Sequence, residues 1–174
     1  MKKPEFEVGW ALPHPPWLKI NVDGAVFERQ RAVGIGVVIR DHLGLVRAAL
    51  SMKIRARLGP LKIEAMAIEE GMGFAWDWGV SIAIFEGDSM VVYHSLMGSV
   101  TPPSSICNLI LGSLLQATRF SKCMFFVVPR SGNKVAHGLA QHVKNLSSSC
   151  TWIGDIPPFL EHLVSHDVLF SSSS

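Results

Sequence analysis

Residues 17–25 read WLKINVDGA, and this stretch decides the fold. Apolar and polar side chains alternate along it: Leu18, Ile20 and Val22 fall on one side, and Lys19, Asn21 and Asp23 on the other. A period of two is typical of a β-strand with one buried face. Asp23 therefore stands on the polar face at the end of a strand, directly before Gly24.

Two further strands are predicted immediately downstream. Residues 33–40 are rich in Val and Ile, residues 41–44 form a short loop that ends in Gly44, and residues 45–52 form the next apolar stretch. Short connections of this kind join antiparallel strands. The first three strands should form an antiparallel meander.

Helices and strands alternate in the remainder of the chain. The pattern predicts helices over residues 61–77, 89–97, 106–119 and 133–144, and strands over residues 81–85 and 122–128. Because helical crossovers join parallel strands, the last two strands should run parallel to a neighbour. The expected fold is α/β, a mixed five-stranded sheet of a three-strand antiparallel meander plus two parallel strands, covered by helices.

Length and composition indicate one globular domain. The chain has 174 residues, of which 48% are hydrophobic and 17% charged, enough apolar material for a single core. The proline-rich residues 1–16 are interpreted as a linker that leads in from something upstream, and residues 17–146 as the domain. Residues 147–174 are interpreted as a C-terminal tail, with mobile serine-rich stretches at 147–149 and 171–174.

Apolar stretches and cysteines bear on location. No apolar run is long enough to cross a membrane, and no signal-peptide core follows Lys2 and Lys3, so no membrane partner is expected. Cys107, Cys123 and Cys150 have neither zinc-site nor disulfide spacing. We expect reduced thiols in an intracellular protein, a monomer, with the compartment open.

The charge balance permits nucleic acid as a partner without requiring it. Sixteen basic and 14 acidic residues give a net charge of +2, whereas proteins that bind nucleic acid by charge alone are strongly basic. Basic side chains cluster at 29–31 and 53–62. They are either phosphate contacts or an ordinary solvated surface.

Glu64 is the first candidate for chemistry. On the predicted helix it shares a face with apolar or small residues, Ala67, Ile68 and Gly71 among them. An unpaired buried carboxylate is costly, so this position indicates a cation, a metal or water at its head. The alternative is a carboxylate that only stabilises the N-terminal end of its helix.

Asp23 and Asp88 each end a predicted strand. Asp23 has the alternative interpretation of a turn residue, and Asp88 that of a helix N-cap. Taken together, the topology brings both to the sheet edge that Glu64 approaches. Three convergent carboxylates repel one another, and a hard divalent cation such as Mg²⁺ neutralises them.

These residues occur in an order that resembles a known family. The segments that carry the likeness are WLKINVDGA at 17–25, Glu64-Ala65 with its helix, EGDS at 86–89, Pro129-Arg130, NKVAHGLA at 133–140 and the ending Trp152 with DIPPFL at 155–160. From Trp17 to about Lys144 the chain resembles the type 1 ribonuclease H domain. In detail it is similar to the plant, retrotransposon-derived branch related to reverse-transcriptase-associated ribonuclease H domains.

The resemblance implies a function and a site. Asp23, Glu64 and Asp88 would be the catalytic residues, holding two Mg²⁺ or Mn²⁺ ions that activate water against the RNA strand of an RNA–DNA hybrid. The same resemblance makes four residues candidates for contact with nucleic acid: Gly24, Ser89, Arg130 and Asn133.

His137 departs from the family pattern. It stands where the family has a fourth acidic residue, and the preceding loop has Val127, Val128 and Pro129 where many family enzymes have a histidine. An imidazole can ligate a metal but favours softer ions than Mg²⁺. His137 is either a fourth metal ligand or an ordinary helix histidine.

Other motifs point to no second site. His162 and His166 have helical metal-site spacing without a third ligand, and Gly34-Ile35-Gly36 lies inside a strand, so neither a second metal site nor a dinucleotide site is expected. The first hypothesis for function is an RNA–DNA hybrid endonuclease. The alternatives are a non-catalytic nucleic-acid-binding module of the same fold and a protein-interaction domain.

Overall fold

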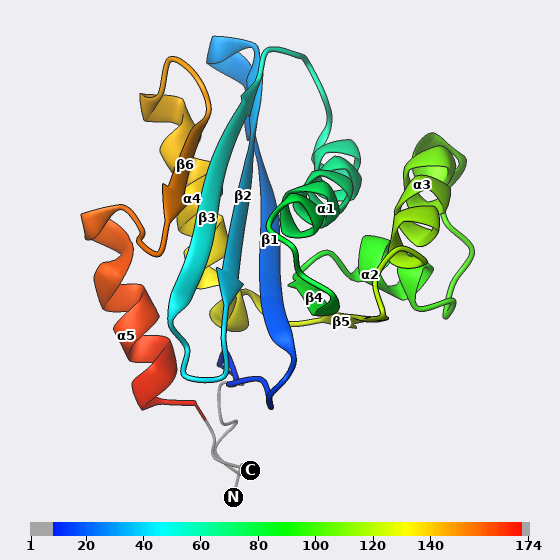
Figure 1. The fold of residues 1–174 in the computed structure, drawn as a ribbon. Helices are drawn as coiled ribbons and strands as arrows, with labels where there is room; N and C mark the ends of the chain where they lie inside the picture. The colour runs from blue at the N-terminus through cyan, green and yellow to red at the C-terminus, as the bar shows by residue number, and fades with distance from the viewer. Residues whose placement is uncertain (1–8, 172–174) are drawn as a thin grey trace, which may run out of the picture.

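A six-stranded mixed β-sheet forms the centre of the molecule (Figure 1). The computed structural model describes residues 9–171. The sheet order is β5-β4-β1-β2-β3-β6. The strands are β1 (Leu18–Phe27), β2 (Ala32–Arg40), β3 (Val46–Ile54), β4 (Ile82–Gly87), β5 (Lys122–Val127) and β6 (Cys150–Ile153).

The pairing confirms the predicted meander and the two parallel strands. β1 pairs with β2, and β2 with β3, in antiparallel fashion. β4 runs parallel to β1 on one side and to β5 on the other. Asn21 lies opposite Glu86 in this register, and Asp23 and Asp88 each stand two residues further along the chain. Asp88 directly follows β4, as predicted, whereas Asp23 lies inside β1, which continues to Phe27, so the prediction that Asp23 ends its strand and the alternative of a turn residue are both wrong.

The predicted count of five strands is wrong by one. β6 pairs antiparallel with β3 at the edge of the sheet, in a stretch that the sequence pattern assigns to the tail. It has only four residues, and exposed serines precede it, so it carries no hydrophobic period of useful length. Its partner strand lies about a hundred positions earlier, and only the folded chain brings the two together.

Five helices cover the sheet. They are α1 (Pro60–Asp77), α2 (Met90–Leu96), α3 (Cys107–Ala117), α4 (Lys134–His142) and α5 (Glu161–Leu169). α1 packs on β1 and β2 and carries α3 on its outer side, whereas α4 packs on β1, β2 and β3. Figure 1 shows α1 and α4 on opposite faces of the sheet, with α5 beyond α4. The four predicted helices are confirmed, with bounds that differ by a few residues at most.

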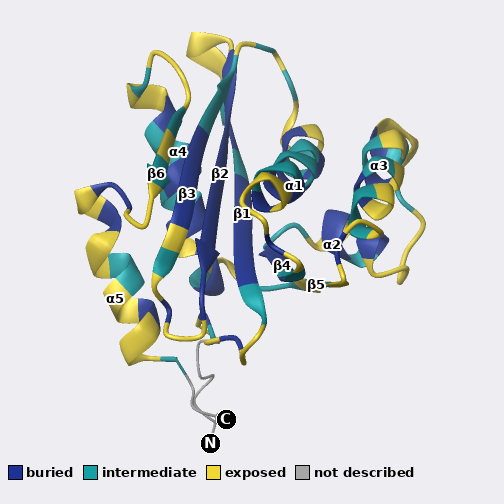
Figure 2. Cartoon of the chain, in the orientation of Figure 1, coloured by how far each residue is buried: buried dark blue, intermediate teal, exposed yellow. Residues whose placement is uncertain are grey.

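The two faces hold separate hydrophobic clusters. The larger lies between the sheet and α1, with α2 and α3 beside it, and includes Ile20, Val22, Ile68, Met72 and Phe85. The smaller lies under α4 and is closed by Ile156 and Leu160 from the segment after β6. Figure 2 shows this distribution, with buried residues along β1, β2 and β3 and mostly exposed residues on α5.

Two glycines let α4 approach β2 closely. A Cβ on Gly36 would lie 2.2 Å from the carbonyl oxygen of Ala136, and one on Gly34 would lie 2.7 Å from that of Ala140. Both distances are too short for real Cβ atoms, so only glycine fits beneath the helix. The prediction that these glycines lie inside a strand is confirmed, and the close packing gives their purpose.

The segments outside the predicted domain take part in the fold. Residues 1–8 of the predicted linker and 172–174 of the tail lie outside the described residues. In the described part of the linker, Trp10 and Pro13 are buried. In the tail, α5 anchors Asp167, which is 6% exposed. The boundaries at 16 and 146 stay predictions, but neither separates packed from unpacked chain.

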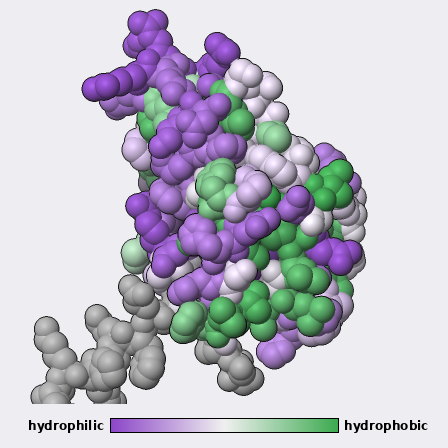
Figure 3. All heavy atoms as spheres, turned by 90° about the vertical axis from the view of Figure 1, so that its left-hand side faces the viewer, coloured by the Kyte–Doolittle hydropathy of each residue, from purple (hydrophilic) through white to green (hydrophobic). Residues whose placement is uncertain are grey.

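Surface hydrophobic residues gather at one end of the α5 face. Figure 3 shows hydrophilic residues over the upper part of this face and hydrophobic ones below. The exposed apolar side chains here come from the β2–β3 turn and the end of α5: Leu43, Leu45, Leu169 and Phe170. Turn and helix meet where Val168 approaches Gly44.

The structure shows the lengths of the helices and the state of the three cysteines. Within residues 9–171, no helix is both long and apolar enough to span a membrane. Cys107, Cys123 and Cys150 are all free thiols, each partly buried. Burial raises the pKa of Cys123 to about 11, so this thiol stays protonated at neutral pH.

Candidate metal centre

The three predicted carboxylates meet at one point. One ligand oxygen from each of Asp23, Glu64 and Asp88 lies within 4.8 Å of the others. They come from three elements: β1, the second turn of α1, and the residue that follows β4 by one position. The prediction that these side chains converge is confirmed.

Asp23 is the buried member of the group. Its residue is 1% exposed, and it lies on β1 opposite Gly36 of β2. Burial and the nearby charge of Asp88 raise its pKa, while hydrogen bonds from His137 and Glu64 act in the opposite direction. Isolation from water and a neighbouring carboxylate both disfavour its charged form.

Glu64 is held by the backbone of β1. The amide of Gly24 donates a hydrogen bond to Oε1 of Glu64 over 3.2 Å. A Cβ on Gly24 would lie 3.1 Å from the side chain of Ile63, so the small residue lets α1 approach. Glu64 points inward, toward β1. The alternative interpretation, a carboxylate that only stabilises the N-terminal end of its helix, does not describe this position.

Burial and neighbouring negative charges both raise the pKa of Glu64. Burial is the largest cause, the charges of Asp23 and Asp88 add to it, and together they raise the pKa to about 9. Without a cation, Glu64 therefore keeps its proton at neutral pH. A group of three carboxylates in which one cannot ionise unaided is a site that a positive ion would complete.

Asp88 faces the group and not the helix behind it. The N-cap of α2 is Ser89, and no side chain caps that helix, so Asp88 is not the N-cap that the alternative interpretation made it. Its Oδ2 lies 3.3 Å from Nε of Arg130. The Arg130 side chain is 71% exposed, so this contact is a solvated one of small energy.

His137 contacts the group from α4. Its Nδ1 lies 2.8 Å from Oδ2 of Asp23, and its side chain is 34% exposed. The ring is thus bonded to a carboxylate of the group. Its predicted role as a metal ligand stays a prediction, because this bond occupies Nδ1 and ties His137 to Asp23.

The donor set suits a hard divalent cation. Carboxylate oxygens are the ligands that Mg²⁺ and Mn²⁺ take, and three of them face one another within bonding reach of a common ion. Burial, together with the charges of Asp23 and Asp88, raises the pKa of Glu64, so its charged form lacks a compensating positive charge. The residues therefore fit the metal that the sequence resemblance implies.

The four predicted nucleic-acid contacts occupy different environments. Gly24 and Ser89 are partly exposed beside the carboxylates, and Arg130 is open to solvent. Asn133 is only 2% exposed, and its amide donates to the carbonyl of Val22 over 2.9 Å. A contact between Asn133 and nucleic acid stays a prediction, whereas its place inside the protein is plain.

Tyr93 packs against Gly87, next to Asp88 in the chain, a contact that the sequence did not reveal. It is 1% exposed, and a Cβ on Gly87 would lie 2.3 Å from its ring. Its hydroxyl has no hydrogen-bond partner among residues 9–171. Burial and the charges of the site carboxylates raise its pKa well above the usual value. Tyr93 follows Asp88 by five positions in the sequence. An aromatic residue in a short helix is ordinarily a core residue, so this spacing alone does not indicate a role near Asp88.

An open hollow lies at the end of β1. It has a volume of about 500 Å³ and runs between the β1–β2 turn and the segment before α1. Arg31 and Arg57 line it, together with Phe27, Glu28 and Leu58. The two predicted basic clusters therefore meet at one place, and the three carboxylates are not among the residues that line it.

Comparison with known proteins identifies the family. Residues 21–143 match the reverse transcriptase-like family. A curated protein of Arabidopsis thaliana, whose provisional name is ribonuclease H protein, is 28% identical over 170 residues. That match covers 97% of this chain but 27% of the relative, so the chain spans about a quarter of the relative's length.

Solved structures share the fold. Ribonuclease H1 of Halobacterium salinarum superposes with a TM-score of 0.68 at 22% identity, over 74% of this chain and 98% of that one. LC11 ribonuclease H1, isolated from compost and solved with an RNA/DNA hybrid, has a TM-score of 0.66 at 18% identity, over 74% and 96% of the two chains. The predicted fold class is confirmed. The chain belongs to the reverse transcriptase-like family, and its fold is that of ribonuclease H.

Proposed function

We propose that this chain is a divalent-metal-dependent ribonuclease that cleaves the RNA strand of an RNA–DNA hybrid. The convergence of Asp23, Glu64 and Asp88 within 4.8 Å carries the proposal. Membership of the reverse transcriptase-like family, and the likeness of the fold to solved ribonucleases H1, support it. The structure of LC11 ribonuclease H1 with a hybrid supports the choice of substrate.

Each carboxylate has a distinct part in the proposed chemistry. Asp23, Glu64 and Asp88 would hold Mg²⁺ or Mn²⁺, two ions in the proposal, which when bound would supply an activated water and positive charge for the phosphodiester. Asp23 would contribute from β1 and Asp88 from the position after β4. Glu64, fixed by the Gly24 amide, would add its charge once it loses its proton. We propose that the Gly24 backbone and the head of Glu64 contact a ribose 2′-hydroxyl, which distinguishes RNA from DNA.

Three exposed or partly exposed arginines are candidates to bind the phosphates of the hybrid. Arg31 and Arg57 in the hollow at the end of β1, and Arg130 next to Asp88, are the candidates for contacts to phosphates. These side chains do not read bases. Recognition by charge and helix shape is what a ribonuclease without sequence preference requires.

A cleavage assay tests the proposal. The full chain is incubated with a labelled RNA–DNA hybrid and Mg²⁺ or Mn²⁺, and RNA fragments are separated by size. Cleavage that stops in Asp88→Asn, which keeps the shape but removes a charge, supports it. Absence of cleavage with both metals contradicts it.

A non-catalytic binding module is the second candidate, and His137 is the observation that favours it. The bond between His137 and Asp23 stands where a fourth carboxylate would serve the cations. If the chain binds hybrid but leaves it intact with either metal, binding without hydrolysis is the function of this site.

A further inference from the structure

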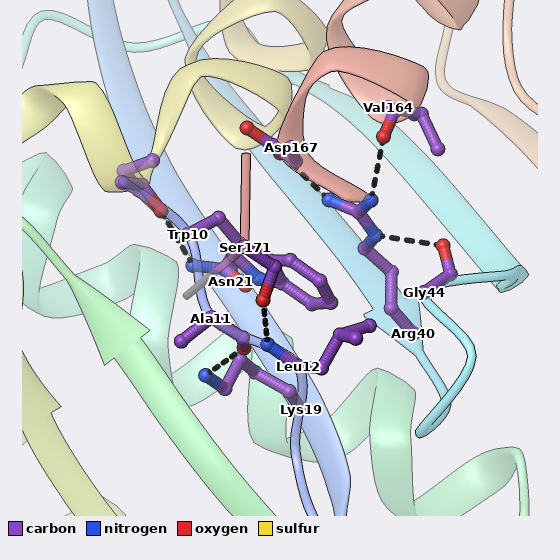
Figure 4. A network of polar contacts seen from close by, with 12 residues as sticks. Trp10, Ala11, Leu12, Lys19, Asn21, Arg40, Gly44, Val164, Asp167 and Ser171 are labelled. Carbon is purple, nitrogen blue, oxygen red and sulfur yellow. Dashed lines mark hydrogen bonds and ion pairs between the residues drawn. The ribbon is translucent and has the colours of Figure 1, made fainter. Parts of the chain in front are cut away.

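A buried polar network ties the N-terminal segment to β1, β2 and α5 (Figure 4). Trp10 is 3% exposed and donates from Nε1 to Oδ1 of Asn21 over 3.0 Å. Asn21 lies on β1, two residues before Asp23. Its own amide donates to Oδ1 of Asn133 over 3.1 Å and to Oε2 of Glu86 over 3.2 Å.

The network reaches the metal ligands by two routes. Asn133 is the N-cap residue of α4, and its side chain donates to the carbonyl of Val22, the residue before Asp23. Its backbone carbonyl accepts from the amide of His137, over 3.0 Å, at the turn that puts the imidazole on Asp23. Asn133 thus joins the strand and the helix on which the two bonded side chains stand.

Trp10 is itself held on the sheet by two buried cations. The guanidinium of Arg40 lies 3.8 Å from the centre of its ring, and Nζ of Lys19 lies 5.2 Å away. Arg40, fully buried, binds Oδ2 of Asp167 in α5 over 2.7 Å. Lys19 binds Oε1 of Glu86 over 3.0 Å. Both cation–π contacts and both ion pairs are shielded from water, which strengthens them relative to surface contacts.

Buried amides of this kind have few alternative arrangements. Asn21 can exchange its partners only by leaving a polar group unsatisfied, because it lies 2% exposed. The indole N–H of Trp10 donates the hydrogen bond that Oδ1 of Asn21 accepts, and so fixes which end of that amide faces Asn133.

We propose that Trp10 is a positioning residue for the metal centre: its indole N–H orients Asn21, which through Asn133 sets α4 and the end of β1 so that Asp23 faces Glu64 and Asp88. The inference rests on the proposed metal-binding function. It gives a role in that function to Trp10, which is not one of the proposed metal ligands. Trp10 also lies outside residues 21–143, the stretch that matches the family.

The test removes the N–H and keeps the ring. Trp10→Phe, and the full chain carrying benzothienylalanine at position 10, are compared with two controls. Trp78→Phe removes an exposed tryptophan, and Ile110→Val destabilises the buried side of α3. Hydrogen exchange at the His137 amide is measured without metal, and Mn²⁺ affinity is measured by calorimetry.

We expect both position-10 variants to speed exchange of the His137 amide and to weaken Mn²⁺ binding, each by about 2- to 10-fold, the effect of one buried hydrogen bond. The controls should change neither beyond their effect on global stability. In an Asn133→Ala background the replacement should have no further effect on Mn²⁺ affinity, because Trp10 acts through Asn133. If the chain cleaves hybrid, kcat should fall while KM for the hybrid stays unchanged.

Three results would overturn the inference. They are unchanged exchange and affinity in the position-10 variants, the same changes in the Ile110→Val control, or loss of the folded state in both position-10 variants, which would give Trp10 a role in folding alone. Failure of the wild type to cleave hybrid counts against the proposed function instead, because amide exchange and Mn²⁺ affinity are measured without hybrid.

Discussion

The contact between His137 and Asp23 sets the chemical character of the site. At 2.8 Å the imidazole is bonded to a carboxylate that is itself 1% exposed. An imidazole brings no negative charge here, whereas a carboxylate would add charge toward a cation. The electrostatic difference between these two side chains follows from the residue type at position 137 alone.

Replacement of His137 by aspartate tests that difference. His137→Asp should raise Mg²⁺ affinity several-fold and raise any Mg²⁺-dependent cleavage rate, because hard cations prefer oxygen ligands, while the wild type should work relatively better with Mn²⁺. Calorimetry and the cleavage assay measure both. His137→Asn, which has similar size but no charge, is the control.

An unchanged Mg²⁺ affinity in His137→Asp would show that position 137 does not face the cations. Asp88→Asn in the same assays should abolish metal-dependent turnover, since it removes a ligand whose charge the cations require.

The protonation of Glu64 predicts how stability depends on pH. In the folded protein its pKa is about 9, whereas an unperturbed glutamate has a pKa of 4.5. The folded state therefore keeps a proton that the unfolded chain releases, and the free energy of unfolding of metal-free protein should fall as pH rises between these values. Thermal unfolding at pH 5.5 and 8, roughly the ends of the accessible range, measures this.

Glu64→Gln is the matched control, because an amide cannot ionise. It should flatten the pH dependence and be more stable than wild type at the higher pH. Mg²⁺ should stabilise the wild type at the higher pH and act less at the lower one. A wild type that grows more stable from acid to neutral pH in chelator would contradict the protonated state of Glu64.

At the scale of helices and strands, the contact between Gly87 and Tyr93 supports the end of β4. Tyr93→Phe removes a hydroxyl that has no partner within the described chain, so it should leave the free energy of unfolding unchanged or raise it by up to about 1 kcal/mol. Gly87→Ala places a methyl 2.3 Å from the Tyr93 ring and should weaken Mn²⁺ binding by displacing Asp88. Urea unfolding and calorimetry measure these effects. A destabilising Tyr93→Phe would show that the hydroxyl has a partner.

The segment after residue 146 packs against the rest of the described chain, although its sequence pattern predicts a tail. A chain that ends at residue 146 lacks β6, Ile156 and Leu160, and leaves buried Arg40 without Asp167. Removal of one partner of a buried ion pair alone costs about 3–5 kcal/mol. We expect the shortened chain to be largely unfolded by circular dichroism. Asp167→Asn in the full chain should lower stability in the same direction, and a cooperatively folded shortened chain would contradict this.

Local patterns are enough to predict the elements that carry the carboxylates. Asp23 lies on an alternating strand, which runs on to Phe27 and does not end at Asp23 as predicted, Glu64 interrupts an apolar helix face, and Asp88 follows a buried strand. Each is visible within about ten residues of sequence. β6 and Trp10 are not predictable in this way. Their roles depend on partners far away in the chain, β3 for one and Asn21, Arg40 and Lys19 for the other. A proline-rich or serine-rich neighbourhood says nothing about such partners.

At the scale of the whole molecule, net charge and local charge have different consequences. The chain carries only +2, so charge alone should not bind every nucleic acid. Arg31 and Arg57 concentrate positive charge in the hollow at the end of β1, where we propose that they contact phosphates of a hybrid. We therefore expect a low overall affinity for nucleic acid, with binding confined to the surface that carries these arginines.

Salt and duplex type test this expectation. Hybrid should bind more tightly than duplex DNA of the same sequence, and affinity should fall as salt rises, because phosphate contacts release counterions. Arg31→Ala with Arg57→Ala should reduce the slope of log affinity against log salt by about 1 for each phosphate that is no longer neutralised. Fluorescence anisotropy measures both, with Arg119→Ala on the far helix side as control. Equal binding of both duplexes, or none at low salt, would contradict the choice of substrate.

The close packing of α4 on Gly34 and Gly36 has a consequence for how this site could be re-engineered or could diverge. With backbone against backbone, the helix has no room to slide or tilt toward the carboxylates when the residue at position 137 changes. The reach of that side chain alone then decides which group meets Asp23 and the cations. An acid and an imidazole at position 137 can therefore replace each other while α4 stays where it is. A single substitution can then change the chemistry of the site without a change of fold.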